Sequence, residues 1–309
     1  KENKENKEDY SGYESLIGNT PLLKLNKLSK IIKNDIYVKM ENLNPGGTGK
    51  DRAAQRMIQC AEREGLLKPG GDVVEGTSGS TGIALASICL ARGYQLHIVM
   101  PDDQAEEKRI ILEKLGAKVV VVPCCAISNE GHYVRVAAKL AKTLNGFYVN
   151  QFENIHNSEV HFEITGPELY QQCNKQIDAF IMSSGTGGTI AGISRYLKQE
   201  HISPQTKIIL ADPNGSSLAN HVKYGICYTV QQSERQLKRN RYDSIVEGVG
   251  IDRLTANYIT ANIDDSITVS DQDLLEMAHW ILENEGIMLG SSSALNITAT
   301  CIYALQLQQ

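Results

Sequence analysis

Short apolar runs rich in valine and isoleucine alternate with segments of helical period through most of this sequence, and that alternation constrains the fold more than any other feature. Runs this short and this apolar are typical of strands buried on both faces of a parallel sheet. The predicted strands are 95–100, 119–122, 147–149, 179–182 and 207–210.

The intervening segments have the period of helices. Residues 51–67 place a single apolar face on one side of a helix, formed by Ala54, Met57, Ile58 and Ala61. Residues 83–90 read as a buried helix that ends at Gly93, and Ser270 with Asp273 forms a capping box for a helix through Glu285. The sequence therefore predicts an α/β fold of repeated βαβ units, and no long linker marks a domain boundary.

Charge and composition exclude several classes of function. The net charge of −5 argues against a nucleic acid or an anionic membrane as the main partner. One basic run at 235–241 is predicted to be a solvated loop, and the polar repeat at 1–10 is predicted to be disordered. The histidines and cysteines do not pair at ligand spacings, so no metal site is predicted.

A glycine-rich segment, Asn44-Pro-Gly-Gly-Thr-Gly-Lys50-Asp51, leads into the first long helix. Glycines let the backbone approach a ligand closely. The segment is not a P-loop, G-x-x-x-x-G-K-[ST], because positions 44 and 51 hold asparagine and aspartate. A cation is disfavoured at a helix N-terminus, which predicts a special role for Lys50. A turn with a surface lysine is the alternative.

A hydroxyl-rich segment, Thr77-Ser-Gly-Ser-Thr-Gly82, precedes the apolar helix. Its hydroxyls and the free N–H groups of a helix start predict an anion cradle suited to a carboxylate. Adenylate-forming enzymes carry a similar string, but theirs continues with Pro-Lys, whereas Ile83-Ala84 follows here.

Two further polar segments follow apolar runs. Ser184-Gly-Thr-Gly-Gly-Thr189 predicts a phosphate site at a strand-to-helix turn, although a simple tight turn is the alternative. A dinucleotide fingerprint fails because Ile190 occupies the position of its third glycine. The serines of Gly290-Ser-Ser-Ser293 either bond a ring nitrogen or cap the next helix, and capping is the default.

These four segments, in this order, resemble the cysteine synthase and cystathionine β-synthase family of fold-type II pyridoxal-phosphate enzymes. The resemblance begins at Ile17-Gly-Asn-Thr-Pro-Leu22 and reaches the serine-rich end. It includes Gln151-Phe-Glu-Asn154, Thr165-Gly-Pro-Glu168, Ala211-Asp-Pro213 and Glu247-Gly-Val-Gly250. Residues 122–134 are most similar to a fungal, mitochondrial branch.

The resemblance implies two open, twisted, mainly parallel sheets with flanking helices and the cofactor in a cleft between two domains. The smaller α/β domain would span 44–154, and the larger one 1–43 plus 155–309. A homodimer in the mitochondrion or the cytoplasm is implied.

The resemblance also implies residue roles. Lys50 would carry pyridoxal 5′-phosphate as a Schiff base and act as the general base at the substrate Cα. Implied cofactor contacts are Ser80, Gly185, Thr186, Gly187, Gly188, Thr189, Gly248 and Ser292, with Ser293 as the alternative to Ser292. The substrate carboxylate would meet Thr77, Ser78, Gly79, Thr81 and Gln151.

The implied reaction makes L-cysteine from an O-activated L-serine, such as O-acetylserine, and sulfide. Alternatives are a cystathionine β-synthase, a cysteine desulfhydrase or serine dehydratase, and a binding or scaffolding paralogue with little turnover. Two departures from the family matter. Ser80 replaces an asparagine, and the sequence ends at Gln309, where the family continues into a further strand whose loss is expected to lower stability.

Overall fold

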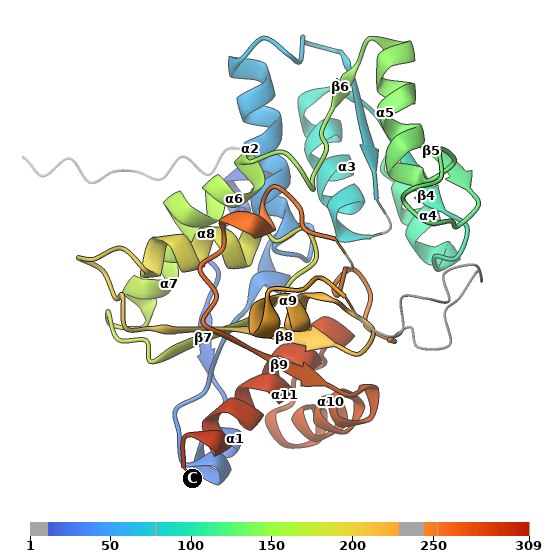
Figure 1. Ribbon diagram of the computed structural model, residues 1–309. Coiled ribbons are helices and arrows are strands. Elements are labelled where there is room, and N and C mark those ends of the chain that lie inside the picture. Colours follow the sequence, from blue (N-terminus) through green and yellow to red (C-terminus); the bar gives the residue numbers. More distant parts are fainter. Residues whose placement is uncertain (1–11, 78, 229–243, 252, 309) are drawn as a thin grey trace, which may run out of the picture.

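The computed structural model describes residues 12–308 except 78, 229–243 and 252 (Figure 1). The polar repeat at 1–10, the basic run at 235–241 and Ser78 lie outside the described residues. Described strands form three sheets, with the orders β1-β2, β5-β4-β3-β6 and β7-β8-β9. The two larger sheets are parallel throughout, which confirms the predicted α/β class with mainly parallel sheets.

The four-stranded sheet is covered on both faces. Its strands are β3 (Asp72–Gly76), β4 (Gln95–Pro101), β5 (Lys118–Val122) and β6 (Phe147–Tyr148). Alternate side chains point to opposite faces, so Val73 packs with helices α2 (Lys50–Arg63) and α3 (Ser80–Arg92), whereas Val74 packs with α5 (Tyr133–Leu144). Helix α4 (Glu106–Lys114) connects β4 to β5.

The three-stranded sheet follows the same rule. Its strands are β7 (Ala179–Ser183), β8 (Lys207–Pro213) and β9 (Asp265–Val269). Ile208 and Leu210 face a cluster with α7 (Gly166–Gln172), α8 (Gly188–Leu197), α9 (Leu218–Tyr224) and the short helix η5 (Tyr258–Thr260). Ile209 and Ala211 face α10 (Asp271–Glu285) and α11 (Ser291–Gln306) instead.

Smaller elements complete the frame. Strands β1 (Leu22–Lys24) and β2 (Tyr37–Lys39) pair antiparallel, and α1 (Asn26–Ile32) packs with α10 and α11. The 3-10 turns η1 (Tyr13–Leu16) and η2 (Glu41–Leu43) lie before the lysine segment. Helix α6 (His156–Val160) continues through a π-helical turn, η3 (His161–Thr165), into α7.

The predicted elements are confirmed with two kinds of difference. Ser270 caps α10, where its Oγ accepts from the Asp273 N–H at 3.1 Å. Helix α2 ends at Arg63, short of 67, because a Schellman turn closes it: Leu66 N–H donates to the Ala61 carbonyl at 2.9 Å. Strands β1, β2, β3 and β9 were not anticipated.

The division into domains stays a prediction. Within the described ranges, no helix is both long and apolar enough to cross a membrane.

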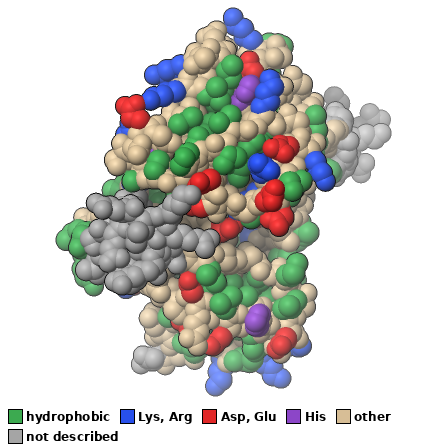
Figure 2. Space-filling view, turned by 90° about the vertical axis from the view of Figure 1, so that its right-hand side faces the viewer, with side chains coloured by type: hydrophobic (Ala, Val, Ile, Leu, Met, Phe, Trp, Pro, Cys, Tyr) green, Lys and Arg blue, Asp and Glu red, His purple; other side chains and the backbone are tan. Residues whose placement is uncertain are grey.

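Figure 2 views the side on which α4, α5 and β5 lie in Figure 1. Acidic and basic side chains are interspersed on this face, with apolar side chains gathered on its upper part. Strand β5 is an edge strand of its sheet, and exposed apolar residues on it and on α4 include Val120, Val121, Ile110 and Ile111.

Candidate active site

Lys50 is the first residue of α2, and the residue after it anchors the turn. Asp51 is completely buried. Its carboxylate accepts from the Tyr13 hydroxyl at 3.0 Å and from the Thr48 N–H at 3.3 Å. An acidic side chain in the first turn complements the helix dipole, which a lysine there does not. The Lys50 amine therefore projects from a turn that its neighbour stabilises.

A network of charges lies behind this turn. The Arg52 guanidinium is 2% exposed and contacts both oxygens of Glu41 at 2.8 Å. It also contacts both oxygens of Glu168, at 2.8 and 2.9 Å. Lys39 pairs with Glu168 and donates to the Thr20 hydroxyl at 2.7 Å. These bidentate pairs join α2 to the β2–η2 segment and to α7.

The network sets the charge near Lys50. Burial lowers the pKa of the Lys50 amine, and the Glu41 carboxylate partly opposes that shift. Burial alone would raise the pKa of Glu41, but the hydrogen bonds and charge of Arg52 outweigh it and hold that pKa below its ordinary value. A lowered pKa favours the uncharged amine, which is the form that acts as a nucleophile or a base.

The hydroxyl segment lies at the start of α3 and turns two hydroxyls inward. The Thr81 Oγ1 donates to Gln151 Oε1 at 2.6 Å, and both residues are buried. Thr77 is buried too, and its Oγ1 accepts from the Gly79 N–H at 3.2 Å. Ser80 is exposed at the first position of the helix. The structure thus brings Thr77, Gly79, Thr81 and Gln151 together, and their contact with a carboxylate stays a prediction.

A buried carboxyl supports this segment from below. Glu75, in β3, is completely buried and accepts from the Gln151 side-chain amide at 3.2 Å and from its backbone N–H at 3.3 Å. Burial raises the pKa of Glu75 to about 8, although the bonds from Gln151 oppose the shift. At neutral pH this carboxyl is therefore largely protonated.

The predicted phosphate segment forms the turn between β7 and α8. Gly187 has φ +85°, and a Cβ there would lie 2.6 Å from Tyr258. A Cβ on Gly185 would lie 2.1 Å from the Gly248 carbonyl oxygen, so Gly248 lies beside this turn, and its contact with the cofactor stays a prediction. The hydroxyl of Ser184 is buried and has no hydrogen-bond partner among the described residues.

Sequence reasoning missed the side chains that hold this turn. Asn157 Nδ2 donates to Thr186 Oγ1 at 2.9 Å and to the Gln151 carbonyl at 2.8 Å. Thr255 donates to the Thr186 carbonyl at 2.7 Å, and Asn257 donates to the Gln151 carbonyl at 3.2 Å. These bonds connect the hydroxyl segment to the phosphate segment through two residues, because Gln151 bonds Thr81 and Asn157 bonds both Gln151 and Thr186. The one sequence signal for these contacts was the group of polar residues that follows Gln151-Phe-Glu-Asn154, which includes Asn157.

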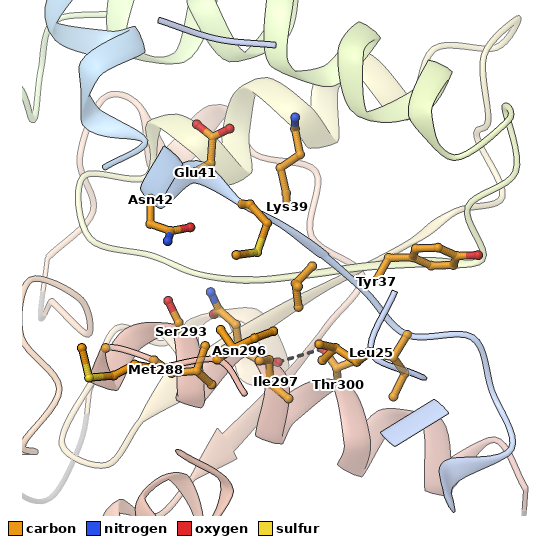
Figure 3. A pocket seen from close by; sticks show the side chains of 16 residues that line it. Leu25, Tyr37, Lys39, Glu41, Asn42, Met288, Ser293, Asn296, Ile297 and Thr300 are labelled. Atoms are coloured by element: carbon orange, nitrogen blue, oxygen red, sulfur yellow. Dashed lines mark hydrogen bonds between the residues drawn. The ribbon is translucent and has the colours of Figure 1, made fainter. Parts of the chain in front are cut away.

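The serine-rich end begins α11, where Ser292 is half-buried and Ser293 is exposed. Ser293 lines a groove that runs between the β2–η2 segment and α11 (Figure 3). Glu41 and Asn42 lie across this groove from Ser293 and Asn296. Neither Lys50 nor the residues 185–189 line it, so the groove is not the predicted phosphate cradle. The choice between Ser292 and Ser293 as the ring-nitrogen partner stays a prediction.

The fold and the lysine and glycine turns define a class of enzyme. The family model described as pyridoxal-phosphate-dependent enzyme matches residues 13–309, and the chain belongs to this family. It is therefore an enzyme that uses pyridoxal 5′-phosphate.

Particular relatives sharpen this class. "Cysteine synthase 2" of Neurospora crassa is 44% identical over 309 residues, which cover 96% of this chain and 68% of that protein. "Putative mitochondrial cysteine synthase" of Saccharomyces cerevisiae is 44% identical over 93% of this chain and 76% of its own length. A solved O-acetylserine-dependent cystathionine β-synthase from Helicobacter pylori matches with a TM-score of 0.82 and 28% identity, over 96% and 90% of the two chains. The family and branch inferred from the sequence are confirmed.

The residues present fit this cofactor. The turn at 185–189 combines glycines, two threonine hydroxyls and the N-terminus of α8, which together suit a phosphate. The unpaired, buried Ser184 hydroxyl adds a polar group at the same strand end. Lys50 supplies the amine that a carbonyl cofactor requires. Among the described residues, no group of three or more His, Cys, Asp or Glu is arranged to hold a metal ion.

Proposed function

We propose that this enzyme makes L-cysteine by β-replacement, in which sulfide takes the place of the β-substituent of an O-activated L-serine such as O-acetylserine. The observation that carries the proposal is the Lys50 amine. Its pKa is lowered at the start of a fixed helix, in a chain 44% identical to a cysteine synthase over 96% of its length.

Pyridoxal phosphate supplies a carbonyl that condenses with amines and a ring that accepts the electron pair released at the substrate Cα. Lys50 is assigned two roles: it binds the cofactor, and its freed amine takes the Cα proton. Burial disfavours the resulting ammonium, and the Glu41 carboxylate favours it. The two influences keep the amine able to accept and then release a proton.

The remaining residues bind and orient. Gly185 to Thr189 and the start of α8 would hold the phosphate, and Ser292, or Ser293 in its place, would bond the ring nitrogen. Gly248 would lie near the cofactor, and Ser80 occupies the position of the family asparagine. The substrate carboxylate is received at the start of α3 by Thr77, Gly79, Thr81 and Gln151, with Ser78 outside the described residues.

The test is a visible absorption titration of the cofactor-loaded protein with O-acetylserine, without sulfide. We expect the band of the lysine-bound cofactor to change on titration and to return, with one cysteine formed per substrate, when sulfide is added. Lys50→Ala should lack the band, whereas Lys142→Ala, an exposed lysine in the last turn of α5, should match the unaltered protein. A band that ignores O-acetylserine would contradict the proposal.

The products formed from the same substrate, with homocysteine in place of sulfide as a further arm, separate the alternatives. A cystathionine β-synthase, the activity in the name of the Helicobacter pylori structure, would join serine or O-acetylserine to homocysteine and form cystathionine. A desulfhydrase or dehydratase would release pyruvate without a second substrate. A scaffolding paralogue, which the Ser80 substitution motivates, would show a band but no turnover with any β-substituted alanine.

Assembly and location belong to the same proposal. We assign amino acid and sulfide as substrates, and a homodimer without a metal or nucleic-acid partner. Light scattering after gel filtration tests the dimer. The name of the Saccharomyces cerevisiae relative supports a mitochondrial location, with the cytoplasm as the alternative. The division into 44–154 and 1–43 plus 155–309 is proposed on the resemblance.

A further inference from the structure

His161 is an interior histidine that the roles proposed above do not use. It is 1% exposed and is the first residue of the π-helical turn η3. The Gly166 N–H donates to the His161 carbonyl, a bond over five residues that makes the turn wider than an α-helix. Turns of this kind are often found at functional sites.

Both ring nitrogens contact a threonine hydroxyl. Nδ1 lies 2.9 Å from Oγ1 of Thr165, in the same turn. Nε2 lies 3.2 Å from Oγ1 of Thr189, which is the last residue of the predicted phosphate segment. The ring therefore connects a hydroxyl of its own turn to a hydroxyl of the cofactor site.

The ring carries only one proton. Burial lowers the pKa of His161 to about 3; the Glu41 carboxylate partly opposes that shift, and the nearby Lys50 and Arg52 side chains add to it. A neutral imidazole has one nitrogen that donates and one that accepts. One of the two threonine hydroxyls must therefore accept a hydrogen bond from the ring, and the other must donate one to it.

The contact between Asn157 and Thr186 shows the direction of the hydrogen bond at the other threonine of the phosphate segment. Asn157 lies four residues before His161, on the same helical run, and its amide donates to Thr186 Oγ1 at 2.9 Å. The Gly188 N–H donates to that oxygen as well, at 3.4 Å. Thr186 Oγ1 thus accepts from the interior, and its proton is available for the site.

If Thr189 likewise accepts a hydrogen bond from the interior and donates to the site, the His161 ring must adopt one particular tautomer. A phosphate offers only acceptors, and a threonine hydroxyl has one proton, so Thr189 can donate to phosphate only while it accepts from the ring. We propose that His161 is a positioning residue whose Nε2–H donates to Thr189, while Nδ1 accepts from Thr165, and that this aims the Thr189 proton at the cofactor phosphate. The inference rests on the proposed function, which places the phosphate at 185–189.

The first test measures the tautomer directly in the cofactor-loaded protein with ¹⁵N-labelled imidazole. The sequence has seven histidines, and loss of one signal set in His161→Gln assigns the residue. We expect a neutral ring with the proton on Nε2 throughout the neutral pH range. A proton on Nδ1, or on both nitrogens, would overturn the inference.

The second test measures affinity. The protein is stripped of cofactor, and its dissociation constants for pyridoxal phosphate and for inorganic phosphate are determined. Thr189→Val should weaken both by about tenfold or more, as expected for one hydrogen bond to a charged group. His161→Asn, which cannot reach the Nε2 position, should weaken both similarly. His161→Gln, which can, should recover most of the loss.

The double variant His161→Asn with Thr189→Val should be no weaker than Thr189→Val alone, because the histidine acts through that hydroxyl. Additive losses, or a His161→Asn variant that binds as tightly as the unaltered protein, would overturn the role of His161 and leave the phosphate site standing. Unchanged affinities in Thr189→Val would instead remove the phosphate site from the proposed function. If His161→Asn does not fold, the tautomer measurement on the unaltered protein decides.

Discussion

The surroundings of Lys50 and those of the predicted phosphate segment are held together by different kinds of interaction. Behind Lys50, charged side chains pair with one another: Arg52 bridges Glu41 and Glu168, and Lys39 pairs with Glu168. Around residues 185–189 the contacts are neutral, with amides, hydroxyls and the His161 ring. The hydroxyl segment, which Gln151 and Asn157 join to that turn, is neutral too: its buried carboxyl, Glu75, is largely protonated at neutral pH because burial raises its pKa to about 8.

The difference follows from what each side has to hold. An amine that gains and loses a proton is served by a nearby carboxylate whose own charge is secured, as Arg52 secures that of Glu41. A dianionic phosphate is best met by a helix N-terminus and by donors with no competing negative charge. The two sides should therefore respond differently to mutation and to pH.

The largest effect is expected at the amine itself. Lys50→Ala should remove the visible band and lower kcat/KM by about a thousandfold or more, because both cofactor linkage and proton transfer are lost. Absorption spectroscopy and steady-state kinetics measure this. A Lys50→Ala enzyme that keeps its band and turns over would remove the distinction between the two sides.

The charged side should be the more sensitive to loss of one partner. Arg52→Leu leaves the Glu41 carboxylate without its cationic partner and leaves Glu168 paired with Lys39 alone, so the free energy of unfolding should fall by about 3–5 kcal/mol. Arg56→Leu is the matched control on the same helix, because its partner Glu163 is half exposed and the pair should contribute about 1 kcal/mol or less. Denaturant unfolding measures both. Equal losses in the two variants would contradict the contrast.

The two sides should fail at opposite ends of the pH range. The pKa values of Glu41 and Glu168 lie below the ordinary value of 4.5 because Arg52 bonds them, so their contribution to stability is present above pH 4.5 and is lost on acidification. Glu75 has a raised pKa, so its contribution is full below pH 4.5 and declines as the pH rises toward 8.

Glu75→Gln should therefore flatten the stability profile between pH 5 and 8, a window in which the unaltered protein should lose about 2–5 kcal/mol. Thermal or denaturant unfolding at several pH values measures the slope. The acid limb, which belongs to Glu41 and Glu168, should be unchanged in this variant. If the neutral-range slope persists, Glu75 is not its source.

On the neutral side, a single lost hydroxyl should have a smaller effect. Thr255→Val removes the donor to the Thr186 carbonyl and the acceptor for the Tyr258 N–H, both buried, and should lower stability by about 1–3 kcal/mol. Thr300→Val is the control, because its hydroxyl bonds only the preceding turn of its own helix and should change stability by about 0.5 kcal/mol. Cofactor affinity should fall in the first variant only.

The smallest expected effect is at Ser80. Ser80→Asn restores the family residue at an exposed helix start, so stability should change by about 0.5 kcal/mol or less. Cofactor affinity and the visible spectrum are the informative measurements, and we expect tighter binding. No change in either would mean that position 80 does not contact the cofactor in this protein.

Much of the fold and several segments of the candidate site could be predicted from the sequence, because their signals are local. The lysine, hydroxyl and phosphate segments can be recognised in the sequence because polar residues and glycines interrupt apolar runs there. The start of α10 can be recognised because Ser270 bonds the N–H of Asp273, only three residues away. The supporting contacts are long-range: Thr186 meets Asn157 across 29 residues and Arg52 meets Glu168 across 116. Nothing in the local pattern selects such partners. Strand β3 was missed because its five residues include Glu75, which breaks the apolar pattern of a buried strand. Only the tertiary structure, which buries Glu75 and bonds it to Gln151, accounts for a glutamate at this position.

Asn257 is a single support on which both halves of the site depend. Its side-chain amide nitrogen lies within hydrogen-bond distance of three carbonyl oxygens, those of Gln151, Phe152 and Asn154, so its two protons are shared among them and close the turn that joins the two halves. Slow hydrolysis of that amide in an ageing protein would replace the donor by a carboxylate, which would face the three oxygens it once bonded. Such a change at Asn257 would therefore loosen the cofactor's surroundings while the Lys50 amine itself stays chemically intact.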